Sequence, residues 1–270
     1  MNIYKFEFKR MLKSCIMWSL VCGGLTVLFM ALFPSMKDMG MQALVDEKMG
    51  ALPTEMLKAF NIESMDFSDV YNYLGYCIQY IAMASAVYGG ILGVNSLIKE
   101  ENQGTIEFLY SMPITRTKIV SSKLLSIVSV YFIYIVIVGT MTMIVTAFVK
   151  PDDVEVIDLI MNIKLIFMGI TLLGMIFLAL GIFISTLVKN DKGSISISIV
   201  IFFVSYFMGI ISKLKDNFEW MRYLSPFDYY LPNNIIKDGF EAKFVMIGVC
   251  IIVVSLLGTY VVYRRKDMKI

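Results

Sequence analysis

The chain has 270 residues, of which 58% are hydrophobic and only 17% are charged. A water-soluble domain of this length needs a far more polar surface, so the composition nearly excludes a soluble enzyme. The net charge of +2 is too small to indicate nucleic-acid binding, and the absence of histidine excludes histidine bases and histidine-ligated metals. The sequence therefore predicts a membrane protein.

Six apolar stretches are long enough to cross a bilayer core as helices, which takes about 20 residues. Because a chain in lipid must satisfy its own backbone hydrogen bonds, we expect an all-α polytopic membrane protein. A single domain over 1–270 holds all six spans. The predicted spans are 15–34, 73–98, 124–148, 163–188, 194–212 and 244–263.

The basic residues between the spans predict how the chain lies in the membrane. The connecting segments on the side of both termini hold 14 Lys and Arg in 50 residues, whereas the other segments hold 9 in 83. The positive-inside rule places the first set in the cytoplasm. Isoleucine is abundant, and 19 Lys against 5 Arg indicate an AT-rich bacterial genome. We expect a multi-pass protein of a bacterial plasma membrane with both termini cytoplasmic.

The first thirteen residues have the pattern of an amphipathic helix, with apolar residues within about 100° of one another on a helical wheel. The basic residues of this segment lie elsewhere on the wheel and are Lys5, Lys9, Arg10 and Lys13. We expect a helix at the inner membrane surface before the first span. A simple basic anchor that fixes the topology agrees equally well with these residues.

Two outer segments have a character of their own. In 35–72, Pro53 and Thr54 are a start signal for one of one or two short extracellular helices that cap the spans. The segment 213–243 is rich in aromatic residues, which are typical of the outer membrane interface. It is too polar to span, but it could enter the membrane and return if other helices cover it.

The segment 99–123 predicts a short helix between two spans on the cytoplasmic side. Gly104 breaks the preceding helix, Thr105 can cap the next one, and Pro113 ends it. Thr115 can then cap the helix that becomes the third span. Acidic residues precede the apolar part and basic residues follow it, so the segment is a candidate docking surface. A solvated loop is the alternative interpretation.

The sequence offers no catalytic chemistry of its own. It lacks the G-x-x-x-x-G-K-[ST] loop that cradles phosphates, so we expect no ATP site and no cofactor in this chain. No carboxylate or lysine lies deep in a span, where ion-coupled transporters usually carry one. The amide Gln79 does lie deep in a span, where it can hydrogen-bond to a neighbouring helix or touch a substrate. Gly89 and Gly93 form a packing face of the G-x-x-x-G type.

The segment 99–123 resembles the cytoplasmic loop of the type-2 ABC exporter permeases, with the pattern E-x-x-x-G-T-x-E-x-L-x-x-x-P-[IV]-[ST]-R-x-x-[IL]-x-x-x-K. The residues in register are Glu100, Gly104, Thr105, Glu107, Leu109, Pro113, Ile114, Thr115, Arg116, Ile119 and Lys123. The six spans, the amphipathic N-terminal segment and the ending Tyr263-Arg264-Arg265 agree in layout with the same family.

The resemblance implies a permease subunit that forms a homodimer or heterodimer in membrane lipid and pairs with separate ATPase subunits, which bind ATP and Mg²⁺. In this family the loop supplies a coupling helix that rests on the ATPase, and the N-terminal helix contacts it too. The implied coupling residues are Glu100, Gly104, Thr105, Glu107, Leu109, Pro113, Arg116 and Lys123. The substrate cannot be inferred, and the alternative is a membrane scaffold for signalling or assembly that transports nothing.

Overall fold

The computed structural model describes residues 3–39, 53–59, 61, 66–102, 114–188, 193–214 and 216–265, and all regular structure in these ranges is helical. Six helices are long and apolar enough to cross a membrane, which confirms the all-α polytopic prediction. They are α1 (Ile3–Ala31), α5 (Val70–Asn102), α7 (Arg116–Val149), α8 (Val156–Ser185), α9 (Ser194–Leu214) and α12 (Ala242–Arg265). The short elements are α2 (Phe33–Asp38), α4 (Thr54–Ala59), η2 (Asp216–Leu224), α10 (Pro226–Tyr229) and α11 (Pro232–Asp238).

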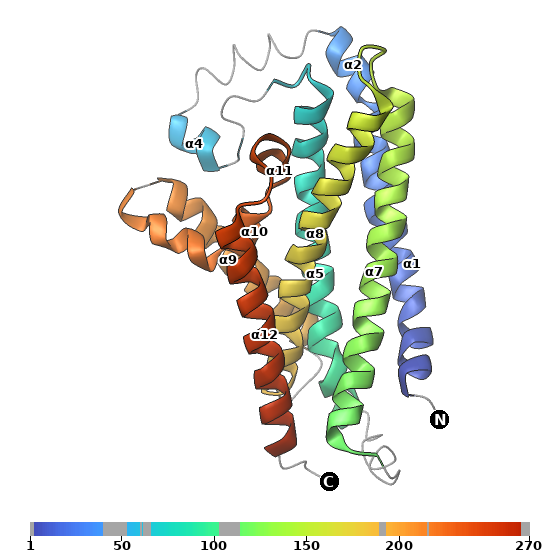
Figure 1. Cartoon of the computed structure of the whole chain (residues 1–270), viewed down its shortest axis with the longest axis vertical. Helices are drawn as coiled ribbons and strands as arrows, with labels where there is room; N and C mark the ends of the chain where they lie inside the picture. The colour runs from blue at the N-terminus through green and yellow to red at the C-terminus, as the bar shows by residue number, and fades with distance from the viewer. Residues whose placement is uncertain are drawn as a thin grey trace.

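The long helices pack in pairs. α5 and α8 make the most extensive contact, α1 lies along α7, α12 packs on α8, and α9 packs on α5. Both termini lie at one end of the bundle, which we call the terminal end (Figure 1). We call the other end the hairpin end, because the turn from α7 to α8 lies there beside α2, with α4 and α11 nearby.

Small residues allow the α5–α8 contact. A Cβ atom added at Gly89 would lie 2.6 Å from the carbonyl oxygen of Gly174, and one at Gly181 would lie 2.7 Å from that of Gly90. Helices in lipid associate through close packing of this kind rather than through a hydrophobic driving force. The packing face predicted from the glycines of α5 is therefore confirmed, and it holds the two central helices together.

Three buried tyrosines join the α1–α7 pair to α5. The Tyr88 ring stacks on Trp18, with centroids 5.1 Å apart, and lies 4.9 Å from the Tyr134 ring. The Tyr134 and Ser85 hydroxyls are 2.8 Å apart, and the Tyr131 hydroxyl donates to a carbonyl of α8 at 3.2 Å. Each buried hydroxyl with such a partner avoids the cost of an unsatisfied polar group.

The N-terminal segment differs from the expectation of a separate helix along the membrane surface. α1 runs unbroken from Ile3, so the basic segment and the first span form one helix. The Ser126 hydroxyl donates to the Tyr4 carbonyl at 3.1 Å, and the Tyr4 hydroxyl donates to Ser129 at 3.2 Å. These bonds hold the start of α1 against α7, so the helix continues in line with the span.

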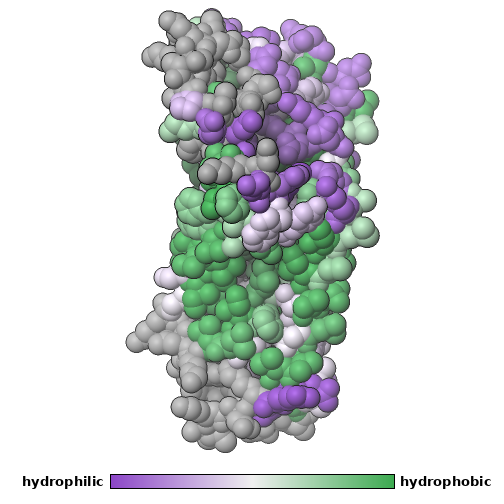
Figure 2. Space-filling model, turned by 90° about the vertical axis from the view of Figure 1, so that its left-hand side faces the viewer, coloured by the Kyte–Doolittle hydropathy of each residue, from purple (hydrophilic) through white to green (hydrophobic). Residues whose placement is uncertain are grey.

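The bundle is taller than a bilayer core. α7 has 34 residues and is about 51 Å long at 1.5 Å per residue, whereas the hydrocarbon core is about 30 Å thick. Figure 2 shows a band of hydrophobic residues with a hydrophilic region above it, toward the hairpin end. The hairpin end therefore extends beyond the apolar band, and α4, which begins at Thr54 as its start signal predicts, lies in this region.

Candidate functional site

The terminal end carries the described part of the predicted coupling segment. Arg116 and Lys123 lie in the first turns of α7, and Glu100 lies near the end of α5. The predicted short helix lies outside the described residues, together with its site residues Gly104, Thr105, Glu107, Leu109 and Pro113. The predicted cap is confirmed, because the Thr115 side chain accepts a hydrogen bond from the backbone of Lys118 at 3.3 Å.

Lys123 joins three helices inside the bundle. Only 2% of its side chain is exposed, and its Nζ donates to the Ser96 carbonyl of α5 at 2.6 Å. The same Nζ lies 3.5 Å from Oε1 of Glu7 on α1, whose side chain is 10% exposed. A buried ammonium is tolerated only when it is paired and hydrogen-bonded, and both conditions are met. Lys123 is thus an internal clamp and not an exposed contact for a partner.

Glu7 is a buried carboxylate at this end of the bundle that sequence reasoning did not identify. It is the only carboxylate in the first 37 residues, and this isolation among basic residues is the one signal that could have identified it. Arg10 lies one helical turn later, with Nη1 3.9 Å from the Glu7 carboxylate. Glu7 and Arg10 line, together with Ser96 and Lys123, a small cavity of about 140 Å³ between α1, α5 and α7.

Arg116 connects the start of α7 to the end of α12. Its Nη1 donates to the carbonyls of Tyr263 at 3.3 Å and Arg264 at 3.2 Å. The last carbonyls of a helix have no partner within it, and a cation there also complements the helix dipole. One turn further along α7, the hydroxyls of Ser121 and Tyr260 lie 2.8 Å apart. The sequence gives no indication of this contact between residues almost 150 positions apart.

The basic residues of the N-terminal segment divide into two groups. Lys5, Lys9 and Lys13 are exposed and recur every four residues, so they form one stripe along α1. Arg10 is half-buried and turns toward Glu7 instead. The terminal end therefore has an exposed basic stripe on the outside and the Lys123 clamp inside.

Within the ranges that the structure describes, no three cysteine or carboxylate side chains gather as a metal site requires.

Comparison with known proteins identifies the family. No curated protein matches the chain. The family model described as ABC-2 family transporter protein matches residues 1–268, which include all six spanning helices and the terminal end. Permeases of this family are membrane transport components that normally work with an ATPase subunit. The chain belongs to the ABC-2 family of transporter proteins.

Proposed function

We propose that the chain is the permease subunit of an ATP-driven exporter. Two such subunits form the translocation path, and each pairs with an ATPase through the 99–123 segment on the cytoplasmic side. Family membership over nearly the whole chain supports the permease role. The concentration of basic residues at the terminal end supports a cytoplasmic position for this end.

The observation that carries the proposal is how the two ends of the 99–123 segment are held. Lys123, the last residue of the segment, donates to the carbonyl of Ser96, just before the segment on α5, and also pairs with Glu7 on α1. Arg116, within the segment at the first residue of α7, is bonded to the last carbonyls of α12. A force on the segment therefore acts on α1, α5, α7 and α12 together, which is what coupling ATP-driven closure to the membrane helices requires.

This arrangement divides the predicted coupling residues by role. Lys123 and Arg116 hold helices of the same chain together, so we assign them to positioning. Glu100, Gly104, Thr105, Glu107, Leu109 and Pro113 stay the proposed contacts with the ATPase. The stripe of Lys5, Lys9 and Lys13 is exposed at the same end and is the proposed second contact, where a carboxylate-rich surface would complement it.

The test is reconstitution with the ATPase subunit. The chain alone is expected to hydrolyse no ATP, because it lacks a phosphate-binding loop. Copurification with the ATPase, ATP hydrolysis stimulated by substrate, and ATP-dependent movement of that substrate across vesicle membranes would support the exporter. Assembly with the ATPase without any movement of substrate would instead favour the scaffold alternative.

Two variants separate contact from positioning. Glu107→Ala is expected to weaken ATPase copurification, because an unpaired interface charge costs about 2–5 kcal/mol. Arg116→Ala is expected to keep the ATPase bound but to lower transport per ATP hydrolysed, because the last carbonyls of α12 lose their two bonds to Arg116 on α7. Lys37→Ala, an exposed lysine at the hairpin end, is the control for charge removal. Full coupling in both variants would contradict the proposed role of the segment.

A further inference from the structure

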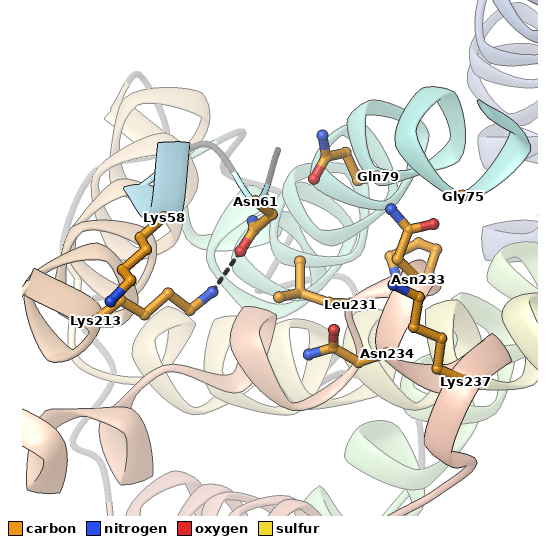
Figure 3. Close-up of a pocket in the computed structure, with 10 residues that line it drawn as sticks. Lys58, Asn61, Gly75, Gln79, Lys213, Leu231, Asn233, Asn234 and Lys237 are labelled. Atoms are coloured by element: carbon orange, nitrogen blue, oxygen red, sulfur yellow. Dashed lines mark hydrogen bonds between the residues drawn. The ribbon is translucent and has the colours of Figure 1, made fainter. Parts of the chain in front are cut away.

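A polar pocket of about 350 Å³ lies at the hairpin end, between α4, α5, α11 and the end of α9 (Figure 3). Three lysines line it, Lys58, Lys213 and Lys237, together with four amide side chains. Its lining, drawn from the described residues, contains no carboxylate. The volume lies within the range of small-molecule sites, and the charge of the lining favours an anion.

The three lysines differ in how they are held. Lys213 is fixed, because its Nζ donates to Oδ1 of Asn61 at 2.6 Å and pairs with the buried carboxylate of Asp228. Lys58 and Lys237 are exposed, and neither forms an ion pair with a carboxylate among the described residues. The pocket thus combines one anchored ammonium group with two whose charge is not neutralised by the described part of the chain.

Gln79 contributes an amide to the lining of the pocket. Only 4% of this residue is exposed, yet its amide forms no hydrogen bond with any residue that the structure describes. Figure 3 shows the amide at the pocket, between Asn61 and Asn233. The amide is open to the pocket, where it can donate to a bound acceptor. The interpretation of Gln79 as a link between helices is therefore not supported by the described contacts.

The wall of the pocket is built by close packing and not by a loose loop. A Cβ atom added at Gly75 would overlap Oδ1 of Asn233, so the absence of a side chain at Gly75 leaves the space that the Asn233 amide occupies between α11 and α5. Ile235, which follows on α11, is 1% exposed and packs in the core. The Asn233 amide is thereby held beside Gln79 on a fixed backbone.

We infer that this pocket binds a phosphate-bearing ligand. Lysine is a common phosphate partner that acts as a point charge, and the amide N–H groups can donate to the remaining phosphate oxygens. The pocket lies at the hydrophilic end, above the apolar band, where either a lipid headgroup or a free phosphate ester can reach it. Cationic ligands are disfavoured by the same lysines. The inference does not depend on coupling to an ATPase.

The binding test uses the purified full-length chain without any ATPase. Glycerol phosphate is titrated into the protein in neutral detergent by calorimetry, with acetate as the carboxylate comparison. Native mass spectrometry of protein from phosphatidylcholine nanodiscs, with and without phosphatidylglycerol, shows whether an anionic lipid is retained. We expect binding that weakens with added salt, because screening reduces the attraction between charges. Binding of glycerol phosphate identifies a soluble source, and selective retention of phosphatidylglycerol identifies a lipid source.

Three variants locate the binding to this pocket. Lys237→Ala and Gln79→Leu are each expected to weaken binding about five- to tenfold, because each removes a donor to a charged acceptor. Lys37→Ala is the matched control, since Lys37 is an exposed lysine at the same end and does not line the pocket. Equal binding of acetate, no binding of either phosphate probe, or unchanged affinity in both pocket variants would overturn the inference. Because Lys237 is exposed, Lys237→Ala keeps the test valid if Gln79→Leu does not fold.

Discussion

Replacing Lys123 by methionine should cost the protein a large part of its stability. The substitution keeps an unbranched side chain, one heavy atom shorter, but removes the charge 3.5 Å from the Glu7 carboxylate. At an effective dielectric constant of about 20, that separation corresponds to an attraction of about 5 kcal/mol. Desolvation of the two groups opposes it, and Arg10 at 3.9 Å still faces Glu7 in the variant. We therefore expect a net loss of about 3 kcal/mol, near the lower end for a buried pair that loses one partner.

The free energy of unfolding in mixed micelles measures this effect, with the thermal midpoint in detergent as a second readout. Lys118→Met is the control, because Lys118 is an exposed lysine on the same helix and its loss should change stability by less than about 0.5 kcal/mol. The double variant Glu7→Gln with Lys123→Met should be more stable than Lys123→Met alone, because no buried carboxylate is then left without its main partner. If Lys123→Met and Lys118→Met are equally stable, the clamp does not contribute as argued.

Two further predictions concern topology and packing. The topology test uses a chain without its native cysteines. Asp152→Cys at the hairpin end should react with an impermeant maleimide in intact cells, whereas Lys118→Cys should react only after permeabilisation. The reverse labelling pattern would contradict the proposed orientation. Gly89→Ala should lower the thermal midpoint, at a cost of about 1–3 kcal/mol, because its Cβ would lie 2.6 Å from the backbone oxygen of Gly174. Gly24→Ala is the control, since nothing lies within 4 Å of its added Cβ, and equal midpoints would argue against the α5–α8 contact.

The spanning helices could be predicted because lipid imposes a simple rule on sequence, namely a long apolar stretch without charges. The extent of the first helix could not. The prediction separated the N-terminal segment from the first span, because its charges end the apolar stretch. In the structure α1 begins at Ile3, since Tyr4 bonds to α7 and Glu7 pairs with Lys123. Such pairings depend on which helices become neighbours, and no local pattern encodes that.

The candidate site shows the same division. Thr115 was predicted as a cap from its position before a helix, and local geometry alone decides such a cap. Arg116 and Lys123 were identified through a motif, but the motif does not say that Lys123 is buried or that Arg116 reaches the end of α12. For Gln79 the sequence left two roles open, and only the arrangement of α5, α4 and α11 places its amide at a pocket.

The length of α7 has a mechanical consequence. A helix of about 51 Å that is bonded to α12 at one end and extends past the apolar band at the other would act as a lever arm if it tilts as one rigid body. A tilt of about 10° around its midpoint would move each end by about 4 Å in opposite directions. Because Arg116 fixes one end of this arm to α12, a small displacement on the side of the termini would reappear, undiminished, at the turn into α8 on the far side of the bilayer.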